Sequence, residues 1–119
     1  MKVLIADDQA EVRSALKVLL EQEMEQDMVS EAEDMETLLL RMESDQPELI
    51  LLDWELSGKS MLRFIPILRQ AAKGLKIIAL SVRPEAARAA MEAGVDAFIS
   101  KGENSDKLLK VIGAIKGQK

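Results

Sequence analysis

Short runs of apolar residues recur along the chain, and each run ends at a polar or charged position. The longest run of large aliphatic residues is Leu49, Ile50, Leu51 and Leu52, which stops at Asp53. Four consecutive large aliphatics fit a strand buried on both faces, as found at the centre of a parallel sheet. Further strands are predicted at residues 3–6, 77–80 and 95–99, which end beside Asp7 and Asp8, Ser81, and Ser100 and Lys101, respectively. Residues 28–31 are partly polar and indicate a strand at a sheet edge.

Between the strands, apolar residues recur with the spacing of helices that rest one face on a sheet. Val12, Leu16, Leu19 and Leu20 predict a helix from about residue 9 to residue 22, and residues 8–11, with Asp8 and Glu11 at their ends, resemble a capping box. Residues 21–27 are acidic and predict a solvated turn. The i, i+3, i+4, i+7 pattern of Met35, Leu38, Leu39 and Met42 predicts a second helix.

Three more helices are marked by their ends as well as by their apolar residues. A third is predicted by Met61, Phe64, Ile65 and Leu68, with Ser60 as a candidate cap. Because Pro66 lacks a backbone donor, we expect a kink or a late helix start near Ile65. Pro84 fits the first turn of a fourth, alanine-rich helix that ends at residues 93–94, and a fifth starts at about Asn104.

Strands and helices therefore alternate along the whole chain. Right-handed crossovers between such strands produce an α/β fold, a five-stranded parallel sheet with helices on both faces. The 119 residues suit one domain, and no repeat or linker interrupts them, so we expect residues 1–119 to fold as a single unit.

Composition narrows the classes of function. A net charge of −5 argues against direct binding of nucleic acids or anionic membranes and favours a protein partner. The chain has no Cys and no His, which excludes disulfides, thiolate or imidazole metal sites and hydrolase triads. With no signal-peptide pattern and no run of about 18 apolar residues, the expected location is cytoplasmic.

The polar residues that end the strands form a candidate site. Asp7, Asp8, Asp53, Ser81 and Lys101 are expected at one edge of the sheet, because the carboxyl ends of parallel strands lie together. Three adjacent carboxylates repel one another by roughly a few kcal/mol at an effective dielectric near 20, and a divalent cation relieves that repulsion. With a hydroxyl and an ammonium beside them, the expected ligands are a divalent cation and a phosphoryl group.

Each of these residues also has a purely structural interpretation. Aspartate is a common helix cap, a lysine usually lies on the surface, and Ser81 suits a cap of the turn before Pro84. Phe98 is of a type more often found in the core, and Trp54 fits a surface loop. The convergence of several groups favours the functional interpretation.

This arrangement of Asp7, Asp8, Asp53, Ser81 and Lys101 at the ends of four strands resembles the receiver domain of two-component response regulators. The resemblance covers essentially the whole chain. It implies a doubly wound, flavodoxin-like sheet of order 2-1-3-4-5, with Mg²⁺ as the cation.

The resemblance also implies roles for individual residues. Asp53 would be the phosphoacceptor, Asp8 a direct metal ligand, Asp7 a ligand through water, and the Glu55 carbonyl a further ligand. Ser81 and Lys101 would hold the phosphoryl oxygens, and Ser81 and Phe98 would act as switch residues.

Two positions depart from the family pattern. Gly102 replaces a common proline after the lysine, and a non-proline cis bond costs about 3 kcal/mol, so we expect a trans peptide. Ser57 replaces a frequent proline in the loop after Asp53.

The expected function is that of a signalling switch. Asp53 would receive a phosphoryl group from the phosphohistidine of a histidine kinase or a phosphotransfer protein, with Mg²⁺ present. The phosphorylated state would alter the surface of the fourth helix, fifth strand and fifth helix, which would act on a downstream protein or output domain. The resemblance implies that Glu55 and Arg83 modulate the rate of dephosphorylation, and their opposite charges suit a pair across the site; the alternative is two solvated surface side chains.

Three other functions fit parts of the pattern. An aspartyl-phosphate phosphohydrolase would use Asp53 as nucleophile with Glu55 as a nearby acid. A nucleotide- or flavin-binding module fits the fold, although acids stand where a glycine-rich phosphate loop is expected. A receiver-like binding module that is never phosphorylated would have the same pattern.

Overall fold

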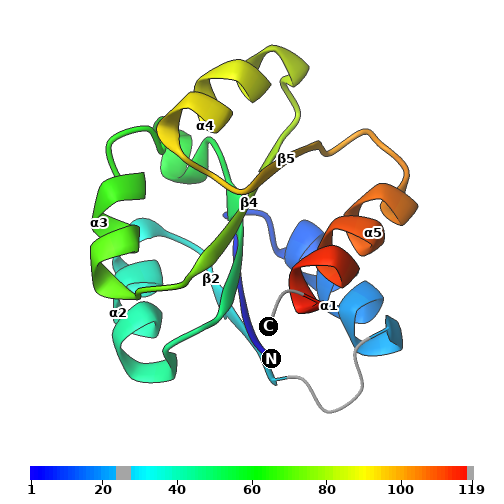
Figure 1. The fold of residues 1–119 in the computed structure, drawn as a ribbon, viewed down its shortest axis with the longest axis horizontal. Helices are drawn as coiled ribbons and strands as arrows, with labels where there is room; N and C mark the ends of the chain where they lie inside the picture. Colours follow the sequence, from blue (N-terminus) through cyan, green and yellow to red (C-terminus); the bar gives the residue numbers. More distant parts are fainter. Residues whose placement is uncertain (24–27, 118–119) are drawn as a thin grey trace.

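Five parallel strands form the centre of the molecule. The computed structural model describes residues 1–23 and 28–117. The strands are β1 (Lys2–Ala6), β2 (Met28–Ala32), β3 (Leu49–Asp53), β4 (Lys76–Ser81) and β5 (Ala97–Ser100). Their order across the sheet is β2-β1-β3-β4-β5, and all neighbours are parallel (Figure 1). This confirms the predicted flavodoxin-like sheet, with β2 at an edge.

Helices cover both faces of this sheet, as Figure 1 shows: α1 and α5 lie on one side and α2, α3 and α4 on the other. Their bounds are α1 Ala10–Glu23, α2 Met35–Asp45, α3 Ile65–Ala71, α4 Ala87–Ala93 and α5 Ser105–Lys116. Two short 3-10 turns, η1 (Leu56–Gly58) and η2 (Pro84–Ala86), precede α3 and α4. None of the helices in residues 1–23 and 28–117 is long and apolar enough to cross a membrane.

β3 divides the interior into two apolar cores. Ile50 and Leu52 pack with α2, α3 and α4, whereas Leu49 and Leu51 pack on the opposite face with α1 and α5. Side chains alternate between the faces of a strand, so a strand in the middle of two helix layers needs apolar residues at every position. The continuous aliphatic run before Asp53 is explained by this double burial.

Several predicted helix boundaries need correction. α3 begins at Ile65, with Pro66 in its first turn where no helical N–H is lost, so the late start is confirmed. Ser60 does not cap this helix; its hydroxyl accepts the Leu62 N–H in the preceding turn at 3.3 Å. Pro84 begins a 3-10 turn rather than α4 itself. The predicted acidic turn falls partly within α1 and partly on residues 24–27, which lie outside the described residues.

Three side chains lie elsewhere than predicted. Near the start of α1 it is Asp7, rather than Asp8 of the predicted capping box, whose carboxylate accepts the Gln9 N–H, at 2.9 Å. Trp54 is buried in the core beside α2 and α3 instead of lying on the surface. Leu39, placed on the apolar face of the second helix, is exposed because α2 rests on the sheet mainly through Leu38 and Met42.

Candidate functional site

Three carboxylates meet where β1 and β3 end. One oxygen from each of Asp7, Asp8 and Asp53 lies within 4.8 Å of the other two. β1 and β3 are direct neighbours, with Ala6 opposite Leu52, so the residues that follow are delivered side by side. Asp7 is 1% exposed and Asp53 5%, whereas Asp8 is exposed. The predicted acidic cluster is therefore formed, with two buried members and one that faces solvent.

Lys101 lies against this cluster from the end of β5. Its ammonium is 2.7 Å from Asp7 Oδ2 and 3.4 Å from Asp53 Oδ1. The Lys101 backbone N–H donates to the Ser81 carbonyl at 2.8 Å, which ties the residue to the end of β4. Lys101 therefore contacts two of the three carboxylates, and the cluster keeps an excess of negative charge. Such a set of hard oxygen donors suits Mg²⁺.

The electrostatic surroundings shift two pKa values. Burial raises the pKa of Asp53 above its ordinary value, and the charges of Asp7 and Asp8 add to the rise, while the Glu55 N–H and Lys101 oppose it. Burial alone would lower the pKa of Lys101, but its hydrogen bond to Asp7 and the attraction of Asp53 outweigh burial and raise that pKa. Asp53 is therefore a carboxylate whose charge the fold stabilises only in part.

Ser81 and Glu55 are joined directly. The Ser81 hydroxyl is 2.8 and 3.0 Å from the two carboxylate oxygens of Glu55, to which it donates, and it accepts the Arg83 N–H at 3.0 Å. The structural interpretation of Ser81 as a turn cap thus holds alongside its place in the site.

The predicted Glu55–Arg83 pair is not formed. Arg83 Nε lies 3.1 Å from Glu85 on the exposed side of the loop, and Glu55 turns inward to Ser81. A buried hydroxyl with an available proton gives the Glu55 carboxylate a better partner than a solvated guanidinium, because exposed ion pairs contribute only about 0–1 kcal/mol.

Arg13 joins the site although the sequence pattern did not single it out. Its guanidinium donates to the Asp7 carbonyl at 2.7 Å and pairs with Glu31 of β2 at 3.1 Å. It therefore holds the main chain that carries the acidic pair. The sequence offered one signal, an arginine in the first turn of α1 and a glutamate on the edge strand. Only the β1–β2 pairing brings the two together.

Gly102 and Ser57, which depart from the family pattern, have backbone conformations that suit their residue types. The described residues contain no cis peptide bond, which confirms the trans bond expected at Gly102. Ser57 has a φ of 58°, a left-handed conformation that a proline ring forbids. Phe98 is half-buried against the core on the α4 side.

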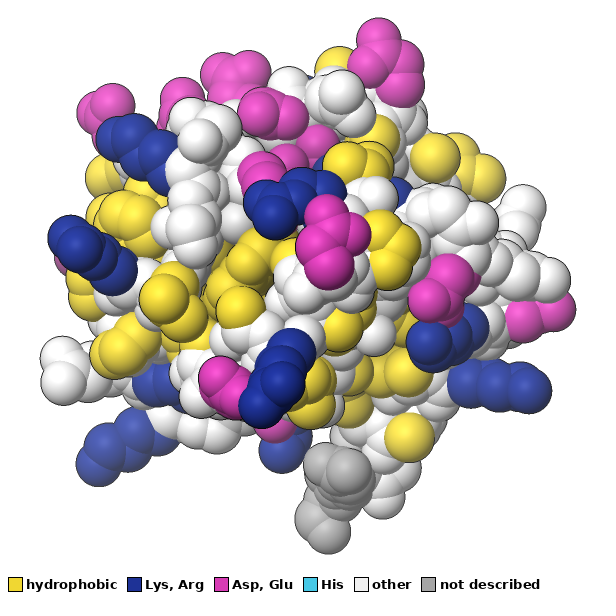
Figure 2. Space-filling view, turned by 90° about the horizontal axis from the view of Figure 1, so that it is seen from above, with side chains coloured by type: hydrophobic (Ala, Val, Ile, Leu, Met, Phe, Trp, Pro, Cys, Tyr) yellow, Lys and Arg dark blue, Asp and Glu magenta, His cyan; other side chains and the backbone are white. Residues whose placement is uncertain are grey.

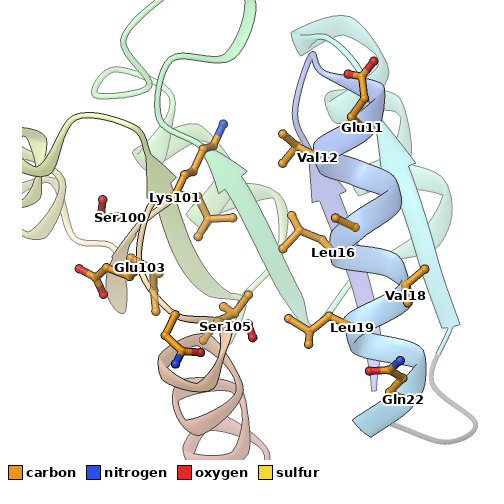
Figure 3. Close-up of a pocket in the computed structure, with 15 residues that line it drawn as sticks. Glu11, Val12, Leu16, Val18, Leu19, Gln22, Ser100, Lys101, Glu103 and Ser105 are labelled. Carbon is orange, nitrogen blue, oxygen red and sulfur yellow. The ribbon is translucent and has the colours of Figure 1, made fainter.

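An apolar groove of about 550 Å³ runs between α1 and α5 (Figure 3). Val12, Leu16 and Leu19 line it from α1, and Lys101 and Ser105 line it from the opposite side. Of the five predicted site residues, Lys101 alone borders it. The acidic cluster lies instead at the ends of β1 and β3. Figure 2, seen from above, shows acidic and basic side chains among apolar ones on the face that it draws.

A doubly wound α/β domain with an acidic cluster and a lysine at its strand ends defines a class of phosphoacceptor signalling domains. Residues 3–113 match the response regulator receiver domain, and the chain belongs to this family. Receiver domains accept a phosphoryl group on an aspartate, bind Mg²⁺ at an acidic pocket and interact with histidine kinases or phosphotransfer proteins.

Relatives and solved structures agree with this assignment. The phosphate regulon transcriptional regulatory protein PhoB of Klebsiella pneumoniae is 32% identical over 118 residues, which cover 96% of this chain and 51% of that protein. The sensory transduction protein LytT of Bacillus anthracis is 27% identical, and the match covers all of this chain and 48% of LytT. The chain thus spans about half the length of these relatives.

Among solved structures, a two-component response regulator from Clostridium difficile shares the fold, with a TM-score of 0.88 at 22% identity over 99% of this chain and 97% of that one. The response regulator TrrA of Thermotoga maritima, solved in complex with Mg²⁺–BeF, has a TM-score of 0.83 at 27% identity and covers 96% of this chain and 97% of its own.

Proposed function

We propose that Asp53 is the phosphoacceptor of this receiver domain and that it takes a phosphoryl group from a phosphohistidine of a partner protein. The observation that carries the proposal is the convergence of Asp53 with Asp7, Asp8 and Lys101 at the strand ends. An Asp53 oxygen attacks phosphorus, the P–N bond breaks, and the departing imidazole keeps the bonding electron pair. The product is an acyl phosphate, which the domain itself hydrolyses slowly.

The acidic residues fit a magnesium site. Asp8 and Asp53 would bind the ion directly, Asp7 through water, and the Glu55 carbonyl would complete the protein ligands. When bound, Mg²⁺ supplies positive charge that offsets the negative charge developing on the phosphoryl oxygens. Lys101 would supply the same kind of stabilisation, since its ammonium already lies 3.4 Å from Asp53 Oδ1.

The signal would leave through the α4–β5–α5 face. Ser81 and Phe98, at or near the ends of β4 and β5, are the proposed switch residues, and Val82 and Met91 leave apolar side chains 69% and 48% exposed close to α4. Exposed apolar side chains favour contact with a downstream protein or an output domain. We place the 119-residue domain in the cytoplasm with its kinase and assign it no direct contact with nucleic acid or membrane.

Intact mass spectrometry after incubation with acetyl phosphate tests the proposal. With Mg²⁺ we expect one added phosphoryl group on the wild-type chain, none after addition of EDTA, and none on Asp53→Asn. Asp106→Asn, which changes an exposed aspartate in the first turn of α5, is the matched control and should be labelled normally. Labelling that persists in Asp53→Asn would refute Asp53 as the acceptor, and an unlabelled wild-type chain would favour a receiver-like module without phosphorylation.

A further inference from the structure

We propose that the Glu55 side chain is an internal competitor of the phosphoryl group: it holds the Ser81 hydroxyl in the unphosphorylated protein and must release it before Ser81 can bind a phosphoryl oxygen. The inference rests on the proposed function of Asp53. It assigns to Glu55 a positioning role that acts through Ser81 and is independent of Arg83.

The proton of the Ser81 hydroxyl already has a partner in the structure. Ser81 is 0% exposed, and its hydroxyl oxygen lies 2.8 and 3.0 Å from the two Glu55 carboxylate oxygens, to which it donates its single proton. The hydroxyl oxygen also accepts the Arg83 N–H at 3.0 Å. A hydroxyl has one proton to donate, so a phosphoryl oxygen obtains this bond only when Glu55 gives it up.

The backbone places Glu55 where its carboxylate and a phosphoryl group on Asp53 would compete for the Ser81 hydroxyl. Its N–H donates to Asp53 Oδ1 at 3.1 Å, and the preceding Trp54 N–H donates to the Leu80 carbonyl at 2.8 Å. Buried Trp54 and Leu56 anchor the loop on either side of Glu55, whose own side chain is only half-buried. The main chain is therefore held next to β4 while the carboxylate keeps the freedom to swing out to solvent.

Phosphorylation of Asp53 changes the balance of charge at this point. The phosphoryl group brings further negative charge to Asp53, whose Oδ1 already accepts the Glu55 N–H at 3.1 Å, and the nearby cation Lys101 is shared with Asp7. Repulsion then disfavours the Glu55–Ser81 bond, and the Ser81 proton becomes available to the phosphoryl group. The bond thus opposes the switched arrangement until the acyl phosphate is present.

A double-mutant cycle with beryllofluoride separates this role from simple charge repulsion. Affinity is measured through Trp54 fluorescence, with Mg²⁺ saturating for each variant, for the wild type, Glu55→Ala, Ser81→Ala and the double mutant. Removing a charge-assisted hydrogen bond that competes with the ligand should let Glu55→Ala bind at least about fivefold more tightly. In the Ser81→Ala background the same change should matter less than about twofold, because no hydroxyl remains to be released.

Glu85→Ala is the matched control, because Glu85 is an exposed carboxylate in η2 that pairs with Arg83; the affinity of this variant should equal that of the wild type. Equal tightening by Glu55→Ala with and without Ser81, or no tightening at all, would overturn the competition while leaving the phosphoacceptor assignment intact. Failure of the wild-type chain to bind beryllofluoride at all would instead overturn the proposed function and this inference with it.

Discussion

Asp53 is buried, and its favourable interactions do not fully offset the cost of its negative charge, so it affects how stability depends on pH. Burial, helped by Asp7 and Asp8, raises its folded-state pKa above the ordinary value of 3.8. The folded state therefore holds this proton more tightly than the unfolded chain does. In the window from pH 3.8 up to the raised pKa, stability falls as pH rises, and at neutral pH the ionised carboxylate opposes folding.

We therefore expect Asp53→Asn to raise the free energy of unfolding at pH 7 in EDTA by on the order of 1 kcal/mol, since repulsion at close range is partly offset by Lys101. Urea denaturation from pH 4 to pH 8 is the measurement. The wild type should lose stability as the pH rises out of the acid range, and the variant should not. Asp106→Asn, which removes an exposed carboxylate, should show no such gain. A less stable Asp53→Asn would contradict this account of the site.

Lys101 is expected to act in the opposite direction. Its ammonium lies 2.7 Å from Asp7, which is buried, so Lys101→Gln leaves a buried carboxylate without its main cation. Loss of such a partner costs about 1–3 kcal/mol, which urea denaturation at pH 7 in EDTA will measure.

The sign of the pH dependence follows from the raised pKa of Lys101. Its stabilisation is fully present below the ordinary value of 10.5 and disappears as pH rises through the higher folded-state pKa. Lys107→Gln, in which only an exposed pair with Glu103 is lost, should cost less than about 1 kcal/mol. Equal losses in the two variants would show that Lys101 is merely another surface lysine.

At the scale of elements, α3 tests how position within a helix changes the effect of a proline. Pro66 lies in the first turn, where its missing N–H would have no helical partner. We expect Pro66→Ala to change stability by less than about 1 kcal/mol, with any loss arising from greater freedom of the unfolded chain. Thermal denaturation decides the point.

Leu68→Pro is the matched comparison in the same helix. Leu68 is buried and its N–H donates to the Phe64 carbonyl at 2.9 Å, so a proline there should cost about 3 kcal/mol or more. A Pro66→Ala variant that gained several kcal/mol would mean that Pro66 strains α3 after all.

At the scale of the whole molecule, the acidic cluster links cation binding to folding. The folded chain gathers Asp7, Asp8 and Asp53, whereas the unfolded chain separates them, so Mg²⁺ should bind mainly the folded state. At about twenty times its dissociation constant, Mg²⁺ should add roughly 1.8 kcal/mol to the free energy of unfolding. Urea denaturation at constant ionic strength measures the gain, and buried Trp54 supplies the signal.

Asp8→Asn provides the control for this linkage. Asp8 is the exposed member of the cluster, so its substitution should weaken the Mg²⁺ effect with little disturbance of the core. An unchanged unfolding midpoint at saturating Mg²⁺ in the wild type would argue against a metal site among these carboxylates.

The sequence by itself determined the fold class and the charged residues that gather at the strand ends. A strand buried on both faces requires apolar residues at every position, so residues 49–52 predicted the centre of the sheet. The polar residue that ends such a run must lie at the carboxyl end of the strand. Asp7, Asp8, Asp53 and Lys101 could be brought together on this argument because parallel strands share the direction of their carboxyl ends.

Only the tertiary structure decided which partner each side chain takes. Glu55 had two candidates within reach of its loop, and the choice of Ser81 over Arg83 depends on depth: Ser81 is buried, while Arg83 and Glu85 stay in solvent. The burial of Trp54 and the contact of Arg13 with the Asp7 carbonyl depend likewise on packing between distant segments. Periodicity reports which face a residue occupies, whereas the partner on that face depends on distances that exist only after the elements have packed.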